Sequence, residues 1–68
     1  MTVASKVKQT IAALKGIKST LEIYAVQSQD EKAVSVYQEG VRVAGEVADD
    51  LGKRLKTLEF EEPEYGGL

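Results

Sequence analysis

The side chains that most often carry enzyme chemistry are scarce in this chain of 68 residues. It contains no histidine and no cysteine, so serine, cysteine and zinc hydrolase arrangements all lack an essential member. Glu39 and Glu46 share a heptad position and could hold a hard cation together with Asp49 or Asp50. Because no Glu-x-x-His pair accompanies them, a solvated helix face is the simpler interpretation. The sequence therefore predicts no enzyme activity, no metal, no cofactor and no small-molecule substrate.

Two other features could be mistaken for ligand sites. Tyr24 and Tyr37 resemble a platform for stacking bases, but their places on either side of a polar stretch favour core packing. Glycines occur inside helical patterns, where no strand precedes them, so a phosphate-binding loop is not predicted. Among these glycines, Gly40 is expected at a close helix contact and Gly52 at a mobile point of its helix.

Charge is distributed unevenly along the chain. The net charge is −2. The first 26 residues carry four lysines against Glu22, whereas the last ten carry four glutamates and no base. Nucleic acid binding requires a concentrated basic surface, which this pattern does not predict. Lys6 and Lys8 interrupt the start of the chain, so we expect no signal peptide or membrane anchor there, and a cytoplasmic protein.

Apolar residues recur at alternating steps of three and four in both halves of the chain. This spacing predicts one amphipathic helix at about residues 2–27 and a second at about 31–59. Between them lies the polar turn at about 28–30, where Ser28 or Asp30 can cap the second helix and Ser28-x-x-Glu31 fits a capping box. The predicted core consists of Val7, Leu14, Ile17, Leu21 and Tyr24 with Tyr37, Val41, Ala44, Ala48, Leu51, Leu55 and Leu58.

The two apolar stripes share one antiparallel register. When they are paired about the turn, Tyr24 faces Tyr37 and Val7 faces Leu55, and the residue numbers of every facing pair add up to 61 or 62. Independent stripes would not need to agree in this way. The sequence therefore predicts an all-α, antiparallel, coiled-coil-like two-helix hairpin over residues 1–58.

A second apolar stripe on the second helix lies outside this hairpin core. It contains Ala33 and the predicted oligomer interface, Val36, Gly40, Val43 and Val47; Ile23 and Val26 lie outside the core on the first helix. Two helices cannot enclose a core alone, and valines gain nothing from exposure on a helix. We therefore expect a homo-oligomer, with a dimer that forms a four-helix bundle as the first model.

The last ten residues, 59–68, form an acidic segment that also contains aromatic residues. Pro63 ends any helix, while Phe60 and Tyr65 are unusual in a purely solvating tail. The register brings this segment near Lys6, Lys8 and the positive end of the first helix, so we expect Phe60 and Tyr65 to make contacts there. The alternative is a disordered acidic tail.

Several motifs together resemble a family of small proteins catalogued as domain of unknown function sixteen fifty-seven, found in endospore-forming Firmicutes. They are Met1-Thr2-Val3, Val7-Lys8-Gln9-Thr10, Leu14-Lys15-Gly16, Leu21-Glu22 with Tyr24-Ala25, and Leu58-Glu59-Phe60-Glu61-Glu62-Pro63 with Tyr65. The resemblance implies a helical protein of a spore former, whose relatives accompany genes for spore membrane proteins or are fused to membrane domains. It implies a forespore or spore location and no reaction. Gly40, Val41, Val43 and Gly45 depart from the family, whose members are richer in Glu and Ala there.

Two function classes follow from these observations. The first is a non-enzymatic structural or interaction module that self-associates, in a spore-associated assembly if the resemblance holds. The second is a peripheral accessory of a membrane protein or of an anionic membrane surface, which Lys8, Lys15 and Lys18 would contact. Vesicle binding separates the two classes.

Overall fold

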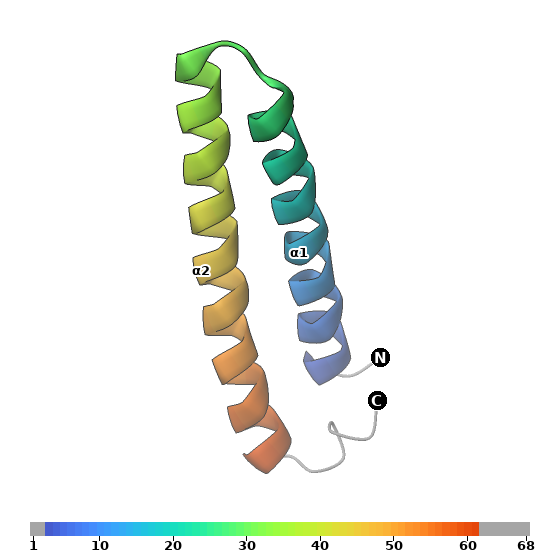
Figure 1. Ribbon diagram of the computed structural model, residues 1–68. Coiled ribbons are helices and arrows are strands. Elements are labelled where there is room, and N and C mark those ends of the chain that lie inside the picture. Colours follow the sequence, from blue (N-terminus) through green and yellow to red (C-terminus); the bar gives the residue numbers. More distant parts are fainter. Residues whose placement is uncertain (1–2, 62–68) are drawn as a thin grey trace.

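The computed structural model describes residues 3–61 as two antiparallel helices joined by a short turn. Helix α1 spans Val3–Gln27 and helix α2 spans Glu31–Glu61, and they lie side by side along their length (Figure 1). The predicted all-α hairpin is thereby confirmed. Helix α2 ends two residues later than predicted, so Phe60 and Glu61 are also helical. No helix-breaking residue follows Gly52 before Pro63, so the sequence contains no stop signal at residue 59.

The turn at residues 28–30 is held by side-chain capping. The Asp30 carboxylate accepts a hydrogen bond from the backbone N–H of Lys32 at 2.9 Å, while the Asp30 N–H donates to the Ser28 hydroxyl at 3.3 Å. Asp30 is therefore the N-cap of α2. Ser28 braces the turn instead of forming the predicted capping box.

Contacts between the helices confirm the predicted register. The ring centroids of Tyr24 and Tyr37 are 5.6 Å apart, with the rings tilted by 56°. One turn further along, a Cβ built on Gly40 would lie 2.9 Å from Leu21 Cδ1. The first is a predicted facing pair, whereas Leu21 was expected opposite Val41 and here lies against the adjacent Gly40.

The face of α1 that packs on α2 is rotated by about 50° from the prediction, half of the angle between successive residues. Ile17 was expected in the core, but its side chain is 52% exposed, whereas Lys18 is partly buried. Tyr24 touches Tyr37 as predicted, yet it is about half exposed. The residues of α1 that are buried or partly buried are Ala4, Ser5, Val7, Lys8, Ile11, Leu14, Lys18, Leu21 and Ala25.

Small residues explain this rotation. Val7, Leu14 and Leu21 belong equally to the predicted stripe and to the observed one, so the choice rests on their neighbours. A Cβ added at Gly45 would lie 3.8–4.0 Å from the outer atoms of the Lys18 side chain. The outer part of the Lys18 side chain, including its Nζ, thus lies over a glycine, while the rest of the stem packs along the hairpin. Ile17 is left on the flank.

The predicted core stripe of α2 lies on the less exposed face of this helix. Every member is buried or partly buried, namely Val34, Tyr37, Val41, Ala44, Ala48, Leu51, Leu55 and Leu58. Only Ala4 and Ala44 are buried among the hydrophobic residues that the structure describes, and no large side chain is fully buried there. The radius of gyration is 15.1 Å, whereas a compact chain of this length would have about 11 Å. The fold is a thin rod whose larger apolar side chains all keep some exposure.

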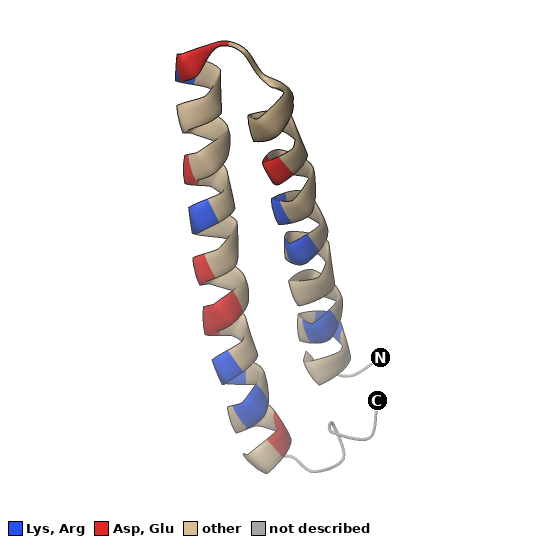
Figure 2. Cartoon of the chain, viewed as in Figure 1, with Lys and Arg blue, Asp and Glu red and all other residues tan. Residues whose placement is uncertain are grey.

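Ion pairs follow the outer side of α2, where basic and acidic residues alternate in the sequence (Figure 2). Arg42 binds both Glu39 and Glu46, and Arg54 donates to Asp50 at 3.0 Å. The hydrogen bond from Arg42, together with its charge, holds the pKa of Glu39 below the ordinary value of 4.5. These pairs are exposed, so solvent screens them and their effect is to support the helix locally.

We predict that Glu39 titrates below pH 4.5 in the folded chain. Because its pKa is lowered on folding, the stabilisation is complete above pH 4.5 and is lost as the pH falls through the lowered value. An NMR titration of the Glu39 carboxyl carbon measures this, and Arg42→Gln should return the midpoint toward the ordinary value. Arg54→Gln is the matched control. An unchanged Glu39 midpoint in Arg42→Gln would show that the pair does not persist in solution.

Alanine substitutions should distinguish a glycine that contacts the opposite helix from a glycine that faces solvent. An added Cβ meets nothing within 4 Å at Gly16, whereas at Gly40 it meets Leu21. Gly16→Ala should raise the free energy of unfolding by about 0.5–1 kcal/mol through helix propensity. Gly40→Ala should gain less, since Leu21 must move. Urea denaturation at one fixed protein concentration measures both, and equal gains would contradict the close contact at Gly40.

Candidate functional site

Five apolar side chains form a surface that the hairpin leaves uncovered, here called the apolar face. Val36 is 68% exposed, and Val43 and Val47 are each 43% exposed. Ile17 and Tyr24, which the rotation of α1 leaves on its flank, complete the set. Single exposed apolar residues are common on protein surfaces, but five from two packed helices are typical of an interaction site.

Helix geometry places these five side chains on one side of the hairpin. Val43 and Val47 lie seven and eleven residues after Val36, which are two and three turns of a helix. On α1, Ile17 and Tyr24 are also two turns apart. A groove on the hairpin, described below, is lined by none of the five. The apolar face and this groove therefore occupy opposite sides of the rod.

Gly40 does not belong to the apolar face. The sequence placed it in the oligomer interface, but a side chain at this position would point at Leu21 of α1. This is a correction: Gly40 makes the expected close helix contact, and it makes it within the hairpin. Its neighbours Val36, Val43 and Val47 have the exposure that the predicted interface requires.

Ile23 and Val26 form a separate patch. Both are exposed, and with Glu22 and Gln27 they line a shallow hollow of about 290 Å³ that belongs to α1 alone. They had been expected to share the oligomer interface with the valines of α2. The structure instead places them away from α2, which makes them useful as a comparison surface.

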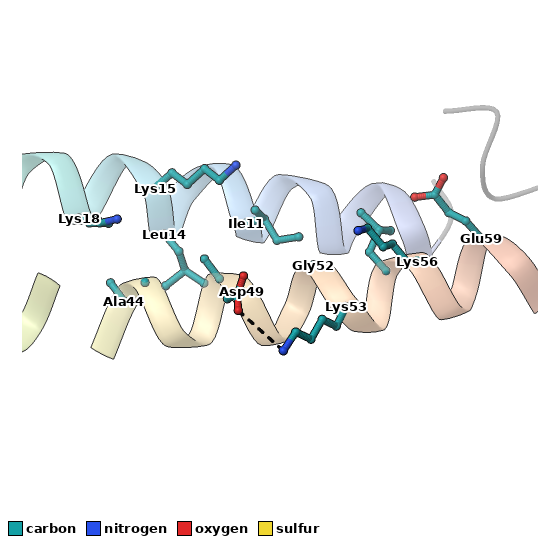
Figure 3. A pocket seen from close by; sticks show the side chains of 13 residues that line it. Ile11, Leu14, Lys15, Lys18, Ala44, Asp49, Gly52, Lys53, Lys56 and Glu59 are labelled. Carbon is teal, nitrogen blue, oxygen red and sulfur yellow. Dashed lines mark ion pairs between the residues drawn. The ribbon is translucent and has the colours of Figure 1, made fainter. Parts of the chain in front are cut away.

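The opposite side of the hairpin carries an open groove of about 630 Å³, here called the lysine groove (Figure 3). Its floor is apolar and comes from Ile11, Leu14, Ala44, Ala48 and Leu55. Gly45 and Gly52, seven residues apart on α2, contribute no side chains and so leave the floor open. The rim is charged and consists of Lys15, Lys18, Asp49, Lys53, Lys56 and Glu59.

The rim has more positive than negative charge. Lys53 pairs with Asp49 at 3.9 Å, both being strongly exposed. Within the described residues, Lys15, Lys18 and Lys56 make no ion pair, and Glu59 lies at the end of the groove (Figure 3). Sequence reasoning missed this groove because its lysines come from both helices. The seven-residue spacing of Gly45 and Gly52 was the available signal.

The two aromatic residues of the C-terminal segment have different outcomes. Phe60 is 87% exposed in the last turn of α2, so it is not packed against the start of α1 as predicted. Tyr65 lies outside the described residues. Phe60 therefore joins the helix and leaves the tail.

The carboxylates of α2 do not converge on one point. Within residues 3–61, no three acidic side chains lie close enough together to hold a metal ion. Glu39 and Glu46 both point to Arg42 instead. A charged residue interrupts each described helix too often for either to cross a membrane.

Comparison with known proteins gives one match. The model of the family described as a protein of unknown function, DUF1657, matches residues 7–55, which include both helices and the turn. No curated protein matches, and no solved structure does. The match takes in most of both core stripes, the turn and the valines of α2, and it covers well over half of the sequence. This chain belongs to the DUF1657 family.

Proposed function

We propose that this protein is a non-enzymatic interaction module that pairs with a second copy of itself through the apolar face. The observation that carries the proposal is the exposure of Val36, Val43 and Val47 beside Ile17 and Tyr24 on one side of the rod. Covering such side chains contributes about 1.5–3 kcal/mol for each one that becomes fully buried. Two hairpins joined face to face make a four-helix bundle, in which these residues form a central layer.

The incomplete core of the hairpin supports the same proposal. The chain exposes 5022 Å², against about 4200 Å² expected for a compact monomer of its mass. Small chains of this kind usually gain stability from disulfides, metals or association. With no cysteine or histidine in the sequence, association is the support that its chemistry permits. The face carries no charged member, which suits a surface that is buried in the dimer.

The role that we propose for the dimer is a structural one, without catalysis. Its chemistry consists of packing surfaces and exposed ion pairs, and the family match brings no reaction with it. A cytoplasmic place in a forespore or spore assembly stays a prediction that rests on the family resemblance alone.

Light scattering across a concentration series tests self-association. We expect a mass near twice 7.4 kDa for the natural chain. The double variant Val36→Glu, Val43→Glu should be monomeric, because four glutamates would be buried in each dimer without partners. The matched control is Ile23→Glu, Val26→Glu, which makes the same change in the separate patch and should remain a dimer.

Two results would contradict the proposal. One is a natural chain that stays at 7.4 kDa at every concentration. The other is dissociation by both double variants to the same extent, which would show a general effect of added charge. Circular dichroism of each variant confirms that the helices remain.

A second candidate function is peripheral attachment to an anionic membrane surface or to its resident protein. The lysine groove favours it, since Lys15 and Lys18 of α1 are joined there by Lys53 and Lys56 of α2. Each lysine near an anionic bilayer contributes about 1 kcal/mol at ordinary ionic strength. This surface is distinct from the apolar face, so attachment and dimerisation are compatible.

Co-sedimentation with vesicles tests this second function. If it is correct, the natural chain binds vesicles that contain anionic lipid and leaves purely zwitterionic vesicles unbound. The variant Lys15→Glu, Lys18→Glu should lose the binding, and Lys32→Glu, whose site lies beside the turn, should retain it. If the same fraction of the protein sediments with anionic and with zwitterionic vesicles, attachment to an anionic membrane surface is ruled out.

A further inference from the structure

The lysine groove has the properties of a binding site for an acidic, partly apolar peptide. Lys15, Lys18 and Lys56 carry charges that no described carboxylate neutralises. Between them the floor is formed by leucine, isoleucine and alanine side chains and by two glycines. A purely ionic ligand would leave this floor uncovered, and a purely apolar ligand would leave the lysines unpaired. A segment that carries glutamates next to an aromatic residue satisfies both.

The chain itself contains such a segment next to the groove. Residues 62–68, which follow α2, read Glu-Pro-Glu-Tyr-Gly-Gly-Leu, with two glutamates and one aromatic ring. Glu59 already lines the end of the groove, so the segment that follows α2 starts at this end. The charges are complementary, since the rim has four lysines against Asp49 and Glu59.

The length of the segment matches the groove. Residues 62–68, seven in number, can extend over about 23–25 Å. From Glu59 back to Ala44, the groove runs along α2 for about 22 Å at 1.5 Å per residue. Pro63 disfavours a continued helix and suits a change of direction at this point. A reversed segment could therefore reach the glycine-lined part of the floor.

We propose that residues 62–68 of the same chain bind in the lysine groove, with Glu62 and Glu64 against Lys56 at its near end and the following residues over the apolar floor. This position lies further along the hairpin than the start of α1, where the sequence had suggested contact. It also lies on the side of the rod opposite the apolar face. The inference is therefore independent of self-association, and either can fail without the other.

Disulfide trapping tests the proposal directly, because the natural chain has no cysteine. In the first variant, Gly52→Cys is combined with Gly66→Cys. An added side chain at Gly52 meets nothing within 4 Å, so the helix tolerates the change. The control combines Thr10→Cys with Gly66→Cys. Thr10 is exposed and lies at the same level of the hairpin, outside the groove lining.

We expect the Gly52 variant to form an intramolecular disulfide roughly tenfold faster than the Thr10 variant, because docking raises the local concentration of the second thiol. Adding Lys56→Gln, which removes the lysine proposed to lie against Glu62 and Glu64, should reduce this ratio toward one. Raising the ionic strength from about 0.1 M to about 1 M should act in the same direction, since it shortens the screening length from about 10 Å to about 3 Å. Circular dichroism checks that every variant remains helical.

Three results would overturn the proposal. The first is equal rates for the groove and control positions at low salt. The second is a fast reaction at Gly52 that neither salt nor loss of Lys56 slows, since this would reflect chain proximity alone. The third is a disulfide that forms mainly between chains, which would assign the groove to a neighbouring copy.

Discussion

Two helices can bury only the narrow line along which they touch, and the rest of this structure follows from that constraint. A third element would cover the flanks of the pair, but residues 3–61 supply none. The two helices therefore gain more from a short distance between their backbones than from large side chains between them. The two buried residues in this range are accordingly alanines. Gly40 admits Leu21 and Gly45 admits the stem of Lys18, so glycines act here as contact residues. The larger apolar side chains are partly covered by the opposite helix and partly exposed.

This constraint gives the rod two sides of different chemistry. On one side, the valines of α2 and the flank of α1 make a surface without charge. On the other, lysines from both helices border an apolar floor. The ion pairs of Arg42 and Arg54 lie outside the groove lining and support α2 locally. An apolar surface favours a partner that excludes water, whereas a basic groove favours a ligand that brings negative charge, so the two sides suit different partners.

Periodicity was sufficient to predict the hairpin, its register and the core stripe of α2. It was insufficient for α1, because the apolar arc of that helix is wide enough for two seams that share Val7, Leu14 and Leu21. The choice between Ile17 and Lys18 depends on what α2 presents opposite them, which is a glycine. The lysine groove depends on the same three-dimensional pairing and on residues that are 30 or more positions apart in the sequence. The spacing of apolar residues within one helix therefore predicts neither the choice between Ile17 and Lys18 nor the lysine groove. The same spacing does predict that the two helices exist and how they pair.

The exchange of Ile17 for Lys18 in the seam has an energetic consequence that favours association. A monomer would gain more from covering the isoleucine, since full burial of such a side chain contributes about 1.5–3 kcal/mol. A lysine stem contributes less and costs rotamer freedom. The sequence nevertheless carries isoleucine on the flank, next to Tyr24 and on the same side of the rod as the valines of α2. A second hairpin on this side would recover the burial that the first one leaves unused, and the two-helix fold is then one half of a larger core.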